Sequence, residues 1–347
     1  MRTARLAAVF GLLPGCVQDH PAWLIDRPLP WGIVASVVQP GPYASGLVVP
    51  DDRVRAVALP LDTLELQALV VAPPDTPALP PPIWFACGVA CLSDLPDLAR
   101  VSACPSPLPL AREAPCRLGE GERIRLVLGG AFSGIPQRGE IPLLAVGSAD
   151  PDLPSETCLE RLAADPREDL GACLVQSRTL ALGPPWKLVD VAPVLGALLF
   201  PELPPDIRDE PVDVHPVLRH IEVVRASPAG AHLLEAHDGD SVSVRPGERI
   251  TLTAVYADDA LQEFYRPIQI QTATGFQFEF VPAVERIQAQ FGFTVRVDDF
   301  DPVWNAQTWR WVVPDVADPF DFHLYADDGR EGRAVARLRF VPERDAP

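Results

Sequence analysis

The stretch VSVRPGERITLTA, residues 242–254, sets the expectation for the fold. Apolar side chains occupy every second position on both sides of a Pro-Gly pair, which is the pattern of two half-buried strands joined by a tight turn. The same alternation recurs further along the chain, at Ile221 and Val223; Phe276, Phe278 and Phe280; Phe291, Phe293, Val295 and Val297; Phe322, Leu324 and Ala326; Ala336, Leu338 and Phe340. Seven short strands of this kind predict a β-sandwich over residues 219–342.

A similar but weaker pattern precedes residue 200, at Ile33, Ala35 and Val37; Leu64, Leu66, Ala68 and Val70; Ile124, Leu126 and Leu128. Pro and Gly clusters separate these runs, so residues 31–199 are expected to form a β-rich domain. Within it, Ser155 is expected to cap a helix over residues 156–164, inside a helical insertion near residues 152–182. The predicted fold class is therefore mainly β, with two β-sandwich domains.

The remaining segments are predicted to be connectors. Among the 347 residues, 41 are Pro, and residues 200–218 combine Pro with acidic side chains, which favours an extended linker. Residues 17–30 are expected to be a tether and residues 343–347 a tail. The formal charge of -18 argues against a nucleic-acid partner, because binding phosphate groups requires a basic face.

The N-terminus has the layout of an export signal. Arg2 and Arg5 precede an apolar run over residues 6–13, which is too short to span a bilayer. The end of the run, residues 13–16, resembles the lipobox of bacterial lipoproteins, although Pro14 departs from the usual small residue. The resemblance implies that residues 1–16 hold a signal peptide and that Cys16 carries a lipid anchor. Val17 follows in place of Asp, which in such lipoproteins implies the outer membrane.

Six cysteines remain after Cys16, and an exported chain is expected to join them in disulfides. Cys158 with Cys173 is the expected local pair, since closing a loop of about 16 residues removes roughly 3 kcal/mol of unfolded-state entropy. Sequential and nested pairings stay open for the other four, which are Cys87, Cys91, Cys104 and Cys116. A zinc site is the weaker alternative for these four, because they lack the paired spacing of common zinc modules.

Two stretches resemble bacterial immunoglobulin-like domains. The first is the Pro246-Gly247-Glu248 turn within residues 242–254, and the second is the run from Trp309 through residues 322–340, which resembles a closing hairpin. The resemblance implies that the sandwiches are immunoglobulin-like, and it implies no enzymatic reaction. With Lys187 as the one lysine against 28 arginines, the chain also resembles exported lipoproteins of high-GC Gram-negative bacteria.

Candidate sites for chemistry have plain structural alternatives. His232, His237, Asp238 and Asp240 are the densest ligand-like cluster, but solvated loop histidines are the better interpretation. Ser241 follows Gly239-Asp240 and is interpreted as a turn residue, since no nucleophile elbow surrounds it. The aspartates of residues 298–301 and 327–328 offer oxygen ligands for calcium, although acidic residues are common in turns.

Three tryptophans, Trp304, Trp309 and Trp311, are a possible ligand surface, with burial in the core as the alternative. We therefore expect a non-enzymatic envelope lipoprotein that binds or scaffolds a protein or glycan partner and is held to the membrane by its N-terminal lipid. No catalytic residue, metal or cofactor is expected. The alternative is an exported metal-dependent hydrolase, or an accessory module of one, that uses His232, His237 and Asp240.

Overall fold

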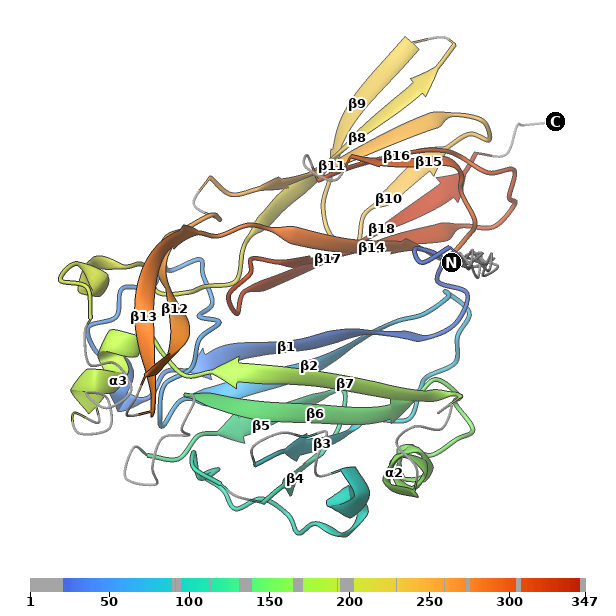
Figure 1. Cartoon of the computed structure of the whole chain (residues 1–347). Coiled ribbons are helices and arrows are strands. Elements are labelled where there is room, and N and C mark those ends of the chain that lie inside the picture. The colour runs from blue at the N-terminus through green and yellow to red at the C-terminus, as the bar shows by residue number, and fades with distance from the viewer. Residues whose placement is uncertain are drawn as a thin grey trace, which may run out of the picture.

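Antiparallel strands dominate the structure, a computed structural model, and they form two stacked sandwiches (Figure 1). The predicted class, mainly β with sandwiches, is confirmed. The residues that the structure describes are 21–88, 91, 95–112, 114–130, 139–164, 171–191, 193, 203–228, 230–258, 260–272, 275–303 and 307–343.

The first sandwich packs a three-stranded sheet against a four-stranded sheet. The former has the order β1-β2-β5, which are Leu29–Gln39, Thr63–Val71 and Arg123–Val127. The latter has the order β4-β3-β6-β7, which are Cys116–Glu120, Ile83–Ala86, Glu140–Ser148 and Cys173–Ala181. The alternating positions of the sequence, such as Ala35 and Leu66, meet Trp84 and Leu143 of the other sheet in one core. Because every second residue of each sheet points inward, the two sheets pack face to face as a sandwich.

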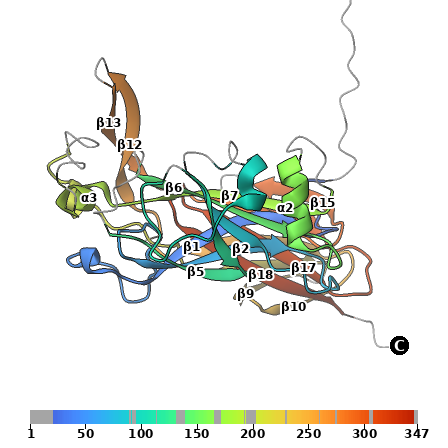
Figure 2. The same ribbon diagram turned by 90° about the horizontal axis from the view of Figure 1, so that it is seen from below.

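Helix α2 (Ser155–Ala164) and the short 3-10 helix η2 (Leu95–Arg100) cover the outer face of β3 and β6 (Figure 2). Leu159 and Leu162 of α2 pack there beside Phe85. The helix begins at Ser155, whose hydroxyl donates to the Pro81 carbonyl at 2.8 Å and so ties the start of the helix to the segment before β3. The predicted insertion is also shorter than expected, because β7 is a full member of the sheet.

The second sandwich packs the sheet β10-β18-β17-β14 against the sheet β15-β16-β11-β8-β9. The first sheet contains Ser241–Val244, Arg333–Pro342, Phe320–Asp327 and Gln288–Phe293. The second contains Asp298–Val303, Thr308–Val312, Arg249–Tyr256, Leu218–Ser227 and Gly230–Ala236. The Pro246-Gly247 turn carries the chain from β10 to β11 and thus from one sheet to the other, with Gly247 at a φ of 79°. That left-handed conformation suits glycine.

Strands β12 (Glu263–Thr272) and β13 (Gly275–Val284) form a separate hairpin, which leaves the second sandwich and runs down beside α3 (Pro185–Val191) (Figure 1). Phe280 of β13 packs against the core of the first sandwich. Strands β9, β12 and β15 lie outside the seven expected runs. Their sequences do not alternate clearly, since β9 is mostly exposed and β15 is acidic with a proline.

The two segments expected to be connectors, the tether and the linker, pack against the body in their described parts. In the tether, Trp23 and Ile25 exchange main-chain hydrogen bonds with Phe293 of β14, and Ile25 is buried. Residues 17–20 lie outside the described part of the chain. In the linker, which includes the 3-10 helix η4 (Ile207–Asp209), Val212 and Val214 are buried, and Val214 bridges to Arg55. Both connectors are therefore part of the packing, and the Arg178 side chain of β7 joins the sandwiches directly through Glu331.

Candidate functional site

The possible tryptophan ligand surface is not formed by Trp309 and Trp311. Trp309 and Trp311 are 4% and 0% exposed, and both lie in the aromatic core of the second sandwich beside Phe322. Trp304 lies outside the described residues. The interpretation of Trp309 and Trp311 as a ligand platform is wrong, because burial of a large apolar ring between two sheets outweighs any benefit of leaving it in water.

The His232, His237 and Asp240 cluster is not assembled into a metal site. All three residues are exposed, and Asp240 accepts a hydrogen bond from the His237 main-chain N–H as a turn residue does. Among the described residues, the one group of three acidic, histidine or cysteine side chains close enough to share an ion is elsewhere. Ser241 begins strand β10 directly after this turn, as expected.

The cysteines form three disulfides among the described residues. Cys158 pairs with Cys173 as predicted, and the open pairing is sequential, with Cys87–Cys91 and Cys104–Cys116. The zinc alternative is wrong, because all four of its thiols are used in these bonds. Cys16 lies outside the described residues.

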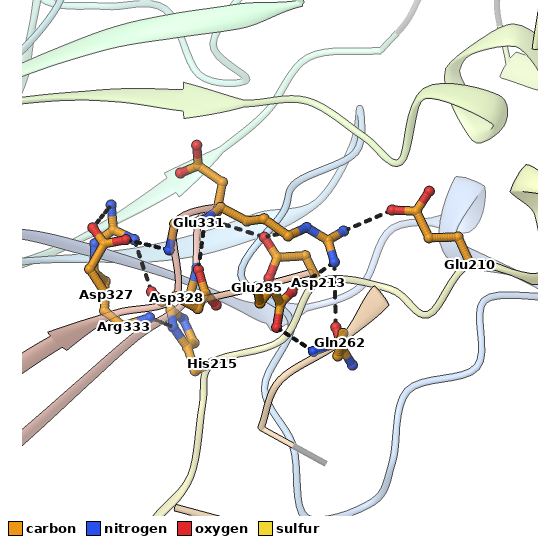
Figure 3. A network of polar contacts seen from close by, with 12 residues as sticks. Glu210, Asp213, His215, Gln262, Glu285, Asp327, Asp328, Glu331 and Arg333 are labelled. Carbon is orange, nitrogen blue, oxygen red and sulfur yellow. Dashed lines mark hydrogen bonds and ion pairs between the residues drawn. The ribbon is translucent and has the colours of Figure 1, made fainter. Parts of the chain in front are cut away.

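A buried network of charged groups lies where the two sandwiches meet, and we call it the junction network (Figure 3). Its members come from the segment after residue 203, the base of the β12–β13 hairpin, the β17–β18 turn and strand β7. They are Arg178, Glu210, Asp213, His215, Gln262, Glu285, Asp327, Asp328, Arg330, Glu331 and Arg333. The network therefore gathers side chains that are up to 155 positions apart in the sequence, Arg178 and Arg333 being the extremes.

Arg178 of β7 ties the first sandwich to the second. Its guanidinium donates to the Glu331 carboxylate at 2.6 Å and to the Glu331 carbonyl at 2.6 Å, and also to the Ile33 carbonyl of β1 at 2.8 Å. The Arg178 and Glu331 side chains are only 6% and 16% exposed. Burial raises the pKa of Glu331, and the nearby Arg178 opposes that shift. This ion pair is thus a desolvated contact between the sandwiches.

Arg330, in the β17–β18 turn, is the central cation of the network. It contacts Glu285 at 2.9 Å and Glu210 at 3.2 Å, and its Nε lies 3.8 Å from Asp213. Main-chain N–H groups hold the same carboxylates in place, since Gln262 donates to Glu285 and Glu331 donates to Asp213. Both kinds of contact fix the positions of the acidic groups.

His215 and Ser36 form a histidine–hydroxyl contact at the junction, with Nε2 2.9 Å from the Ser36 oxygen. The His215 Nδ1 accepts the main-chain N–H of Arg333, so the proton of the neutral ring is on Nε2. That tautomer donates toward Ser36 and the Ala35 carbonyl and has no lone pair with which to take the serine proton. Burial lowers the pKa of His215 to about 4, which keeps the ring neutral. The pair is a structural contact and lacks the geometry of an activated serine.

The acidic groups outnumber the basic ones in the network. Burial raises the pKa of Asp213, Glu285 and Glu210, and it raises that of Asp328 to about 8, with the neighbouring Asp213 and Glu285 charges adding to the effect. The sequence singled out Asp327 and Asp328 as a turn. It did not indicate Glu210 and Asp213, because they stand in a Pro-rich acidic segment whose composition is typical of a solvated linker.

A cavity of about 540 Å³ opens next to the network, at the base of the hairpin. Acidic and aromatic side chains line it, including Asp206, Asp209, Glu210, Glu263, Phe264 and Tyr265. The Tyr265 hydroxyl donates to Asp206, and Arg330 lies 4.7 Å from the centre of the Phe264 ring. Glu210 therefore connects the buried network with this acidic opening.

Neither a protein-family model nor a curated protein matches the sequence. In the described part of the chain, none of the helices has the length and apolar character needed to cross a bilayer. The site is thus interpreted from its own geometry.

Proposed function

We propose that the chain is a membrane-anchored envelope lipoprotein that acts as a binding module and docks a protein or glycan partner through the β12–β13 hairpin. In this proposal, the stacked sandwiches are a rigid support, and the hairpin with the cavity at its base is the docking element. The lipid on Cys16 holds the support at the membrane, with the outer membrane as the expected location.

The observation that carries the binding role is the position of the exposed apolar side chains. Of the eleven exposed large hydrophobic residues in the described part of the chain, five lie on or beside the hairpin: Leu261, Ile268, Ile270, Val281 and Val284. The antiparallel register pairs Arg266 with Val281 and Ile268 with Glu279, so Ile268, Ile270 and Val281 share one face. Figure 2 shows the hairpin projecting from the body. Apolar groups concentrated on a projecting element are typical of an interaction surface.

Two features support export. Three disulfides are the expected state of cysteines in an oxidising compartment and are rare in the cytosol. The signal-like N-terminus has a cysteine at the position where lipoproteins are acylated. Metabolic labelling with a fatty acid tests the anchor: we expect labelling of the wild type and none of Cys16→Ala. Equal labelling of both chains would contradict the anchor.

The docking role is tested by site-specific photocrosslinking in the native host from positions 268 and 281. We expect both positions to capture the same partner, and we expect Ile270→Asp to abolish capture because it replaces an apolar contact of this face by a charge that binding would desolvate. Leu233→Asp is the matched control, since Leu233 is 63% exposed on β9, which lies far from the hairpin (Figure 1). Unchanged capture by the Ile270→Asp chain, or equal loss with Leu233→Asp, would contradict docking through the hairpin.

A further inference from the structure

The junction network contains more negative than positive charge. Its six carboxyl groups face three guanidinium groups, and His215 is neutral. Most of these side chains are removed from water: Asp213, Glu285 and Asp328 are 1%, 3% and 1% exposed. An uncompensated buried charge is costly, so such groups are normally paired, protonated or bound to a metal ion. The excess at the junction requires one of these solutions.

Three buried carboxylate oxygens in the network have no hydrogen-bond donor among the described residues: Oε2 of Glu210, Oδ1 of Asp213 and Oδ2 of Asp328. The last two belong to acids that lie close to each other. The second oxygen of each of these two acids is engaged, since Asp213 accepts the Glu331 N–H at 3.0 Å and Asp328 accepts the Arg330 N–H at 2.8 Å. The main chain therefore holds each carboxylate by one oxygen and leaves the other available. An unsatisfied buried oxygen of this kind indicates a missing partner.

The positions of the acids match a small cation. Asp213, Glu285 and Asp328 each offer an oxygen, and the three oxygens lie within 4.8 Å of one another. Oxygens bound to one calcium ion at 2.3–2.6 Å are separated by no more than about 5 Å, so a single ion can reach all three. Calcium accepts irregular arrangements of oxygen ligands, whereas magnesium requires near-octahedral geometry and usually keeps several waters. A buried site made by carboxylates from three segments suits calcium better.

Gly332 lies directly against this group. A β carbon at position 332 would be 1.9 Å from Oδ2 of Asp328 and 2.7 Å from the Val214 carbonyl oxygen. The glycine therefore allows the β17–β18 turn to approach the segment that carries Asp213. Arg330 compensates part of the negative charge through its ion pair with Glu285. It does not donate a hydrogen bond to the free oxygens of Asp213 and Asp328.

We propose that Asp213, Glu285 and Asp328 bind one calcium ion at the junction of the two sandwiches. The ion links the segment between the sandwiches to the base of the hairpin and to the β17–β18 turn, and it compensates the excess negative charge. It stabilises the contact between the sandwiches independently of any partner. The competing solution is a proton held by Asp328, and the two predict different behaviour.

The test uses the full chain with its disulfides intact at pH 8. Calcium is titrated through 0.1–10 mM after treatment with EDTA, because sites of extracellular modules bind calcium at about 10⁻⁴–10⁻³ M. We expect isothermal titration calorimetry to give one calcium ion per chain, and the thermal midpoint to rise with calcium as for a ligand that binds only the folded state. Asp328→Asn is expected to abolish both effects. Asp240→Asn, a change of the same kind at an exposed turn, is expected to keep them.

Two results would overturn the proposal. One is the absence of stoichiometric calcium binding to the wild-type chain at 10 mM calcium. This result does not depend on the folding of any variant. The other is a thermal midpoint that does not change with calcium at pH 8 but rises in EDTA as the pH is lowered toward 6. A protonated carboxyl without any calcium ion would give this result. Calcium binding that persists in Asp328→Asn would also overturn the assignment of this residue.

Discussion

Replacing Arg178 by Met removes the charge that connects β7 to Glu331 and keeps a side chain of similar length. The change leaves the Glu331 carboxylate buried without its cation, and it leaves the carbonyl oxygens of Ile33 and Glu331 without the Arg178 donor. Breaking a buried pair in this way costs about 3–5 kcal/mol. Because a chain of 347 residues unfolds with an entropy of about 0.7 kcal/mol/K, at about 2.1 cal/mol/K per residue, we expect the melting temperature to fall by about 4–7 °C.

Arg208→Met is the matched control. Arg208 also contacts a carboxylate with two nitrogens, at 2.8 and 3.1 Å from Asp190, but these side chains are 58% and 36% exposed. Exposed pairs contribute little because water already solvates both charges, so we expect no measurable change. Thermal unfolding followed by circular dichroism compares the two variants at one pH and salt concentration.

A second change separates the loss of the pair from the cost of the charge left behind. In Arg178→Met with Glu331→Gln, the unpaired carboxylate is gone, and we expect most of the lost stability to return. The reasoning is refuted if Arg178→Met costs no more than Arg208→Met. It is also refuted if the double variant is as unstable as the single one.

Three further expectations concern pH, disulfide bonds and the core. Burial lowers the pKa of His323 from 6.5 to about 4. Between these two pH values the unfolded chain binds a proton that the folded chain excludes. The unfolding free energy of the wild type should therefore fall by up to about 3 kcal/mol as the pH is lowered from 6.5 to 4. His323→Phe should flatten that part of a pH series of urea midpoints, whereas a change at the exposed His232 should not; parallel curves for all three chains would contradict this. Replacing Cys158 and Cys173 together by Ser should lower the unfolding free energy by about 3 kcal/mol in urea titrations, because a loop of 15 residues is released, and an unchanged midpoint would count against it. Trp311→Ala should cost about 3–5 kcal/mol, since Trp311 is 0% exposed in the core, and a cost below 1 kcal/mol would be inconsistent with this packing.

The alternation of apolar residues predicted much of the fold. Leu64 and Leu66 of β2, and Ile250 and Leu252 of β11, are buried as period two requires, since a strand that faces a core on one side must alternate. The Pro246-Gly247 turn was likewise predictable because turns of this kind depend on local backbone preferences. Strands with weak alternation, such as β9, were not predictable from the sequence.

The residues of the candidate site, in contrast to the strands, were not predictable from the sequence. The sequence singled out His232 and His237, which are exposed, and it singled out Trp309 and Trp311, which are buried in the core. The segment that contains Asp213 is rich in acidic residues and proline, and this composition predicts a solvated linker. Only the packed structure shows that these acids are buried against a turn more than a hundred residues away.

The sequence by itself determined the class of fold, the turn between the sheets and the local Cys158–Cys173 bond. Each of these depends on a repeating pattern along a strand, on a local turn, or on two cysteines only 15 positions apart in the sequence. The tertiary structure alone decided that the sandwiches touch, that Arg178 meets Glu331, and that three acids converge beside Gly332. Such contacts join segments that are distant in sequence, and the free energy of a buried charge depends on surroundings that no local pattern encodes.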